Sequence, residues 1–168
     1  DWIEAEMYED MLSAAQLYSV DAVYCDMVME ESEGQRLLQY NNQYSDHLLM
    51  RECLVPITVV YLSMCNKLIS RKVIEKYHIR AVVGANMWED VELAVRVRYY
   101  MQTSFVINKG YYHYDVSNVS STTHDRLMSR IEGQVQRVRQ IEQFFRNGGE
   151  WKQYHHFVSL LKLQAKSD

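Results

Sequence analysis

The feature that most constrains the fold of this chain is a change of pattern near residue 121. Beyond it, apolar residues recur at steps of three or four, which is the spacing of an amphipathic helix. These positions are Leu127, Ile131, Val135, Val138, Ile141 and Phe145. The spacing predicts a long helix over residues 123–146, which Gly148-Gly149 ends, and a further helix over residues 151–166.

Before this change, patterns typical of short helices and strands alternate. Residues 3–18 carry apolar groups at helical spacing, and residues 21–30 (DAVYCDMVME) have the β-branched and aromatic residues of a strand. The polar residues 30–46 predict a loop, and residues 47–54 predict a short helix that ends near Pro56. The chain is therefore expected to open with a helix and a strand.

The alternation continues up to residue 121. In order, the sequence predicts a strand over residues 62–69, a helix over 71–78, a helix over 88–101, and strands over 104–108 and 111–116. The last two strands flank Lys109-Gly110 and resemble a hairpin. Alternation over residues 1–122, followed by helices over residues 123–168, predicts an α/β fold with a mixed sheet, flanking helices and a C-terminal helical tail.

Charge and cysteine content narrow the expected setting. The formal net charge of −4 is opposite to that of a surface that binds phosphate backbones, so nucleic acid is not an expected partner. Cys25, Cys53 and Cys65 are an odd number without paired metal-ligand spacing, which indicates thiols in a reducing compartment. No run approaches the roughly 18 apolar residues that a membrane helix needs. A cytoplasmic protein is therefore expected.

The sharpest candidate for chemistry is the segment Trp88-Glu89-Asp90, which follows a Gly-containing break and starts a predicted helix. In α/β proteins, ligands bind at the edge of the sheet where such segments lie. A carboxylate there is suited to act as a general base toward an attacking hydroxyl. Acids in a first helical turn also complement the helix dipole. The spacing alone leaves both interpretations open.

Weaker candidates lie in other segments. His113 ends an aromatic strand before a polar loop that contains Ser120, and it could bind a diphosphate or a metal, although a lone His is more often structural. Lys67, which follows Asn66, could face an acceptor or a phosphate, or it could extend from a strand edge into solvent. Asp1 could cap the first helix or belong to an acidic metal-binding turn.

Several short motifs follow one another in a recognisable order. They are DWIE before a helix, a strand ending in YCD, then CNKLISR, NMWEDV, YYHY and a Ser-Ser-Thr loop. In this order they resemble the family-two glycosyltransferases, which are inverting enzymes of the GT-A fold, and among them the bacterial enzymes that build surface polysaccharides. The resemblance covers roughly residues 1–122. It implies the acceptor-side half of such a domain, without the N-terminal nucleotide-binding half.

The resemblance implies a role for each acceptor-side candidate. The Glu-Asp pair of the family falls on Glu89 and Asp90, and Asp90 would deprotonate an acceptor hydroxyl in a single displacement with inversion. Glu89 would orient the site or cap the helix. Trp88 would stack on an acceptor sugar ring or anchor the core, and Lys67 and Asn66 would contact the acceptor.

The resemblance also implies the donor-side partners. His113 and Ser120 match the part of the fold that closes over the diphosphate. Asp1-Trp2 resembles the end of the acidic motif of the family, so Asp1 would lie beside metal-binding aspartates upstream. A nucleotide-sugar donor, a saccharide or lipid-linked acceptor and a divalent metal, Mg or Mn, are expected for the full-length protein. This stretch alone is expected to retain no metal and to be inactive.

The C-terminal helices leave further alternatives open. The long helix could mediate homo-oligomer formation, or it could lie at the inner face of a membrane that carries a lipid-linked acceptor. Its arginines are Arg126, Arg130, Arg137, Arg139 and Arg146, which could equally form a solvated face. The main alternative to an enzyme is a non-catalytic assembly module that self-associates through these helices. A hydrolase is the least favoured, because adjacent acids rarely give the opposed geometry, roughly 5–10 Å, that it needs.

Overall fold

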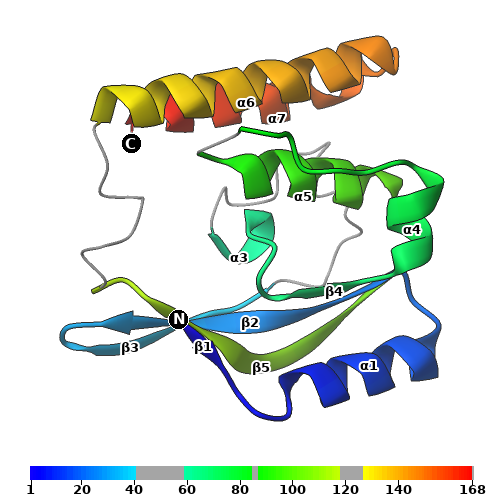
Figure 1. The fold of residues 1–168 in the computed structure, drawn as a ribbon, viewed down its shortest axis with the longest axis vertical. Coiled ribbons are helices and arrows are strands. Elements are labelled where there is room, and N and C mark those ends of the chain that lie inside the picture. Colours follow the sequence, from blue (N-terminus) through cyan, green and yellow to red (C-terminus); the bar gives the residue numbers. More distant parts are fainter. Residues whose placement is uncertain (41–58, 85–86, 118–126, 168) are drawn as a thin grey trace.

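The computed structural model describes residues 1–40, 59–84, 87–117 and 127–167. In chain order its elements are β1 (Trp2–Ile3), α1 (Met7–Tyr18), β2 (Ala22–Glu31), β3 (Gly34–Leu38), α3 (Val59–Leu62), β4 (Lys67–Ile69), α4 (Arg71–Lys76), α5 (Glu89–Tyr100), β5 (Ser104–Asp115), α6 (Leu127–Asn147) and α7 (Trp151–Ser167). A five-stranded mixed sheet has α1 on one face and α3 and α5 on the other, and α6 and α7 form an outer layer (Figure 1). The predicted α/β fold with C-terminal helices is confirmed.

The central strand of the sheet is β2. It pairs in parallel with β5, and it pairs antiparallel with β4 along its first residues and with β3 along its last. β1 pairs antiparallel with the far edge of β5. The first six residues of β2, from Ala22 to Met27, are all buried. A strand with both faces covered needs apolar residues throughout, which explains the nearly continuous apolar run in the sequence.

The two faces of the sheet are covered differently. On one face, Met7 and Met11 of α1 pack against Val23 and Cys25 of β2. On the other face, a larger cluster joins residues of β2, α3, α5, α6 and α7. The C-terminal helices therefore share a core with the α/β layer. The division into a domain over residues 1–122 and an extension over residues 123–168 stays a prediction.

The predicted hairpin around Lys109-Gly110 is wrong, because the structure has one continuous strand, β5, at this place. The pairing with β2 is irregular there, since Cys25 lies opposite Ile107 and Asp26 opposite Gly110. Asn108 and Lys109 are left without opposing residues in β2, so this segment forms a bulge instead of a turn. A Cβ at Gly110 would lie only 2.6 Å from Val28 Cγ2, so the close approach of the two strands requires glycine.

The loop predicted over residues 30–46 is wrong in part, because Gly34–Leu38 form β3 and a hairpin with β2. Cross-strand pairs stabilise this edge: Gln35 Nε2 donates to Glu30 Oε1 (2.9 Å), and Arg36 Nε donates to Glu31 Oε1 (2.9 Å). Polar composition suits an exposed edge strand as well as a loop, which is why the pattern misled the prediction.

Two other predictions change at their boundaries. The first helix begins at Met7 instead of residue 3, because Trp2 and Ile3 pair with β5 as β1. The strand predicted over residues 62–69 is confirmed only at Lys67–Ile69, and the helix α3 occupies Val59–Leu62. The helix predicted over residues 47–54 lies outside the described residues. The predictions of β2, α4, α5, α6 and α7 are confirmed to within a few residues.

None of the helices in the described parts of the chain combines the length and the apolar character that crossing a bilayer takes.

Candidate functional site

Helix α5 brings the segment Trp88-Glu89-Asp90 to the side of the sheet where β2 and β5 end. The helix finishes beside the start of both strands, because the Asp21 N–H donates to the Thr103 carbonyl (3.1 Å) there. Its 12 residues rise about 18 Å back along the sheet (Figure 1). Its first turn therefore lies toward the carboxyl ends of the parallel strands, the edge at which α/β folds bind ligands.

Asp90 is a half-buried acid in this first turn. Burial raises the pKa of its carboxyl above the ordinary value, and the Glu89 carboxylate adds to the rise. The hydrogen bond from the Val91 N–H to Asp90 Oδ1 (2.8 Å) and the Lys67 ammonium act in the opposite direction on the pKa. A carboxylate with a raised pKa is a stronger base than a free aspartate, which suits proton abstraction. Glu89 itself is exposed.

Trp88 precedes α5 in an unusual backbone conformation. Its φ of 57° lies in the left-handed region, which is unfavourable for a bulky side chain. Its carbonyl accepts the Glu92 N–H (3.1 Å), and its half-buried ring packs against the larger core cluster. Packing that holds a residue in such a conformation also fixes the start of α5. The core contact is therefore established, and stacking of Trp88 on an acceptor sugar stays a prediction.

Asn66 and Lys67 form a buried hydrogen-bonded pair between α3 and β2. Asn66 Nδ2 donates to the carbonyls of Cys25 (2.8 Å) and Val60 (3.0 Å). Lys67 Nζ donates to Asn66 Oδ1 (2.6 Å) and to the carbonyls of Ser63 (2.5 Å) and Val60 (3.2 Å). These bonds hold the segment after α3 against the sheet, close enough to Asp90 for Lys67 to act on its pKa. Contact of either side chain with an acceptor stays a prediction.

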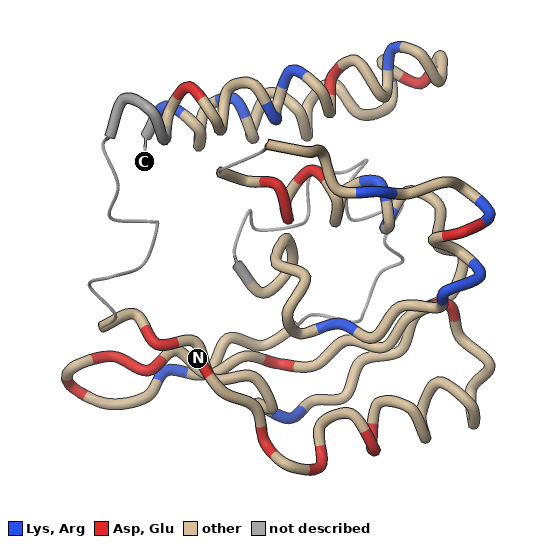
Figure 2. The backbone as a smooth tube through the Cα atoms, viewed as in Figure 1, with Lys and Arg blue, Asp and Glu red and all other residues tan. Residues whose placement is uncertain are grey.

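His113, another predicted site residue, lies on β5 beside β1. Its Nδ1 is 2.6 Å from Glu30 Oε1 and its Nε2 is 3.0 Å from Glu4 Oε1. Trp2 stacks on its ring with a centroid distance of 4.9 Å. Figure 2 shows further acidic residues along the nearby β2–β3 turn and α1. A diphosphate here would meet carboxylates that repel it, and the predicted diphosphate contact of His113 stays a prediction.

Asp1 and Ser120 complete the predicted set. Asp1 Oδ2 accepts the Tyr112 hydroxyl (2.9 Å) and Asp1 Oδ1 accepts the Asp115 N–H (3.0 Å). No cluster of three or more His, Cys, Asp or Glu side chains suited to a metal ion occurs among the described residues. A single carboxylate that is already engaged does not fit Mg or Mn by itself. The metal therefore stays a prediction for the full-length protein, and Ser120 lies outside the described residues.

Sequence reasoning missed Asp26, a buried acid in the centre of β2. Its side chain is only 1% exposed, and its Oδ1 accepts the Tyr40 N–H (2.6 Å). Its Oδ2 has no hydrogen-bond partner in the part of the chain that the structure describes. Burial raises the pKa of the Asp26 carboxyl. A charged residue in the middle of the apolar run DAVYCDMVME was the available signal.

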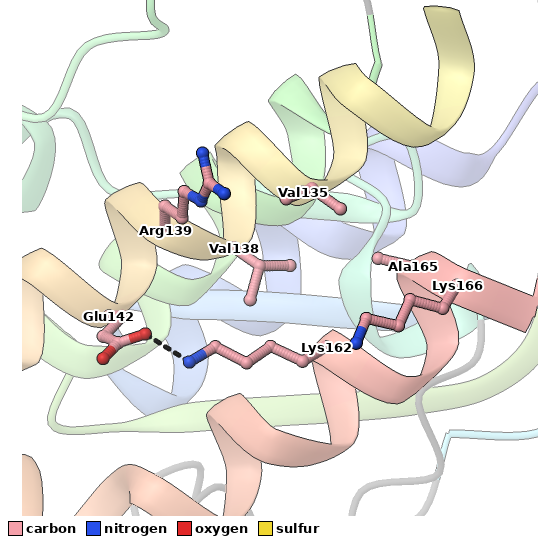
Figure 3. Close-up of a pocket in the computed structure, with 7 residues that line it drawn as sticks. All are labelled: Val135, Val138, Arg139, Glu142, Lys162, Ala165 and Lys166. Carbon is pink, nitrogen blue, oxygen red and sulfur yellow. Dashed lines mark hydrogen bonds and ion pairs between the residues drawn. The ribbon is translucent and has the colours of Figure 1, made fainter. Parts of the chain in front are cut away.

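A second candidate site is a cleft of about 280 Å³ between α6 and α7 (Figure 3). It is lined by Val135, Val138, Arg139, Glu142, Lys162, Ala165 and Lys166. Lys162 extends across it and pairs with Glu142 (Figure 3). The hydrogen bonds from Lys162 and Arg146 lower the pKa of the Glu142 carboxyl. The one acid in the lining is thus a weaker base than a free glutamate, so the cleft is less suited to proton abstraction than the surroundings of Asp90.

The similarity of this chain to known proteins lies in its fold. No protein-family model matches it, and no curated protein matches it. Among solved structures it is similar to the crystal structure of S. aureus TarS 1-349 in complex with UDP-GlcNAc, with a TM-score of 0.60 and 14% sequence identity. The match covers 83% of this chain, and the chain spans 40% of the TarS structure. The likeness shows that this chain has a glycosyltransferase-like fold.

Proposed function

We propose that this chain is the acceptor-side part of a sugar-nucleotide glycosyltransferase and that Asp90 is its general base. The observation that carries the proposal is the placement of one carboxylate. Asp90 is half-buried, its pKa is raised, and it lies in the helix turn that faces the ligand-binding edge of a glycosyltransferase-like fold. The UDP-GlcNAc in the TarS structure supports a nucleotide sugar as the donor.

The proposed reaction is a single displacement. Asp90 takes the proton of an acceptor hydroxyl, and the acceptor oxygen forms a bond to the anomeric carbon of the donor sugar. The bond between that carbon and the diphosphate breaks, and its electron pair leaves with the nucleoside diphosphate. Attack and departure occur on opposite faces of the carbon, so the configuration inverts.

The acceptor is proposed to be a saccharide or a lipid-linked hydroxyl in the synthesis of a bacterial surface polysaccharide. The order of the motifs from DWIE to YYHY supports this class. The proposal places the donor-binding half and its metal in the longer protein, in the cytoplasm or at the inner face of the membrane. The residues described here supply the base and the walls around it, and no step is assigned to the metal.

The test uses the full-length protein with Asp90→Asn, and Glu132→Gln, an exposed acid of α6, as the matched control. Loss of a general base lowers kcat by roughly 10²- to 10⁴-fold. We expect this loss in sugar transfer, with calorimetric binding of the nucleotide sugar unchanged. The control should transfer sugar at the wild-type rate. Turnover that survives in Asp90→Asn would remove Asp90 from the role of base.

A second candidate function is self-association through α7. Leu163 is 65% exposed and Leu160 is 37% exposed on this helix, which leaves apolar surface for a second copy of the chain. The test is the mass by light scattering of the wild type, of Leu163→Glu and of Gln153→Glu, an exposed control on the same helix. A dimer that only Leu163→Glu dissociates supports this function. A wild-type monomer rejects it.

A further inference from the structure

One face of α6 lies along α5 in a fixed register. At one end, a Cβ on Gly133 would lie 3.1 Å from Met87 Cβ, so the helix backbone touches the residue just before Trp88. At the other end, the rings of Phe145 and Tyr99 are 5.9 Å apart between centroids. In both pairs the residue of α6 follows its partner by the same number of positions in the sequence. The two helices therefore run side by side in the same direction (Figure 1).

This register places Arg137 opposite the first turn of α5. Arg137 is one helical turn after Gly133 and one turn before Ile141, so it shares their face of α6. The same difference in residue number that sets Gly133 opposite Met87 sets Arg137 opposite Val91, the residue after Asp90. A residue of the C-terminal helices therefore lies across from the helix turn that carries the proposed base.

Arg137 is buried, and within the described part of the chain it lacks the partners that a buried guanidinium needs. Its side chain is 4% exposed, and its Nε and Nη1 make no hydrogen bond to any described residue. Among the residues that the structure describes, it forms no ion pair with a carboxylate. An unpaired buried charge is strongly unfavourable, so a guanidinium in this state is suited to receive an anion.

Three other arginines differ from Arg137, because each has partners for its guanidinium or is exposed to solvent. Arg98 is also buried, but its Nη1 donates to the Tyr61 carbonyl (2.7 Å) and its guanidinium lies over three tyrosine rings. Arg146 pairs with Glu142 (2.7 Å), and Arg139 is exposed to solvent. Arg137 combines burial with unsatisfied donors, and it does so beside the candidate site.

We propose that Arg137 binds a phosphate group of the substrate beside the first turn of α5, so that the C-terminal helices complete the site. This inference rests on the proposed function. The planar guanidinium donates two parallel hydrogen bonds to phosphate oxygens, a match that a lysine does not offer. The phosphate belongs either to the donor diphosphate or to a phosphorylated acceptor.

The test measures binding to the full-length protein, so that it does not depend on sugar transfer. The variants are Arg137→Met and Arg137→Lys, with Arg71→Met, at an exposed arginine of α4, as the matched control. The probes are uridine diphosphate for the donor and glucose 6-phosphate for an acceptor phosphate, both titrated by calorimetry. Loss of a charge-assisted hydrogen bond predicts affinity about 10- to 100-fold lower in Arg137→Met, an intermediate loss in Arg137→Lys and none in Arg71→Met.

Each outcome decides the inference. Weaker uridine diphosphate binding assigns Arg137 to the donor, and weaker glucose 6-phosphate binding assigns it to the acceptor. Unchanged affinity for both probes in Arg137→Met overturns the proposal. Thermal unfolding without ligand adds a separate readout: removing an unpaired buried charge leaves Tm unchanged or raises it, whereas removing a residue with a partner inside the protein lowers it. If sugar transfer fails in every variant and the binding difference remains, only the proposed function is rejected.

Discussion

The two faces of the sheet bury different kinds of side chain. The face toward α1 buries a small apolar set: Met7, Met11, Ala14, Val23 and Cys25. The face toward α5 buries a larger apolar cluster together with Asp26, Asn66, Lys67 and Arg98. Polar groups cost free energy when they leave water and must be compensated by hydrogen bonds or ligands. The buried charged and amide side chains therefore lie on the face toward α5, which is also the face that carries the candidate site.

The largest effect on stability is expected from Asn66→Ala, on the polar face. The substitution removes both donors to the carbonyls of Cys25 and Val60 and the acceptor of Lys67 Nζ. Buried polar groups left unsatisfied cost about 1–3 kcal/mol each, so the free energy of unfolding should fall by about 4 kcal/mol. Urea denaturation measures it, with Asn147→Ala at the exposed end of α6 as the control. A loss no greater than that of the control would show that the polar face is not held by this pair.

The next effect is expected from Met11→Ala, on the apolar face. Met11 is fully buried against β2, and truncation of such a side chain leaves a cavity and costs about 3 kcal/mol. The same urea measurement gives this loss. The kcat of sugar transfer by the full-length protein should stay at its wild-type value at a temperature at which the variant is folded. A fall in kcat would show that the face toward α1 also contributes to sugar transfer.

The sequence-based predictions succeeded where a local residue pattern decides the structure and failed where pairing with a remote element decides it. Apolar spacing located α5, α6 and α7, and β-branched and aromatic content located β2, because a buried helix face or strand needs such residues whatever its partner is. The Lys109-Gly110 prediction failed because a turn and a bulge favour the same residues. Which of them forms depends on the parallel pairing with β2, which is remote in sequence.

For the candidate site, the sequence located Asp90, since its place at a helix start is local information. It could not show that Asn66 and Lys67 are hydrogen-bonded to each other and to backbone carbonyls. The burial of Asp26 and Arg137 was missed, because burial of a charge depends on the packing of distant elements. The sequence therefore identified the charged residues but could not predict the environment of each one.

A smaller, pH-dependent effect is expected at Asp26. Burial raises the pKa of its carboxyl in the folded protein above the value of about 3.9 in the unfolded chain. The folded state then binds the proton more tightly, so this contribution to stability is present below pH 3.9 and is lost as the pH rises through the folded-state pKa. Urea denaturation across this range should show a loss that is smaller in Asp26→Asn. Parallel pH profiles for the two proteins would contradict it.

The smallest effect on stability is expected from Glu142→Gln. This substitution tests whether a charged pair near the surface contributes as much to stability as the buried polar groups of the α5 face. Glu142 pairs with Lys162 and Arg146, but the side chains of these partners are 44% and 47% exposed, so water screens the pairs. Exposed pairs contribute about 0.5 kcal/mol, and salt weakens them further. The difference in unfolding free energy between Glu142→Gln and the wild type should be of this size at low ionic strength and should vanish in 1 M NaCl. A salt-independent loss as large as that of Asn66→Ala would mean that charge pairing on the outer helices, and not burial on the α5 face, dominates the polar contribution to this fold.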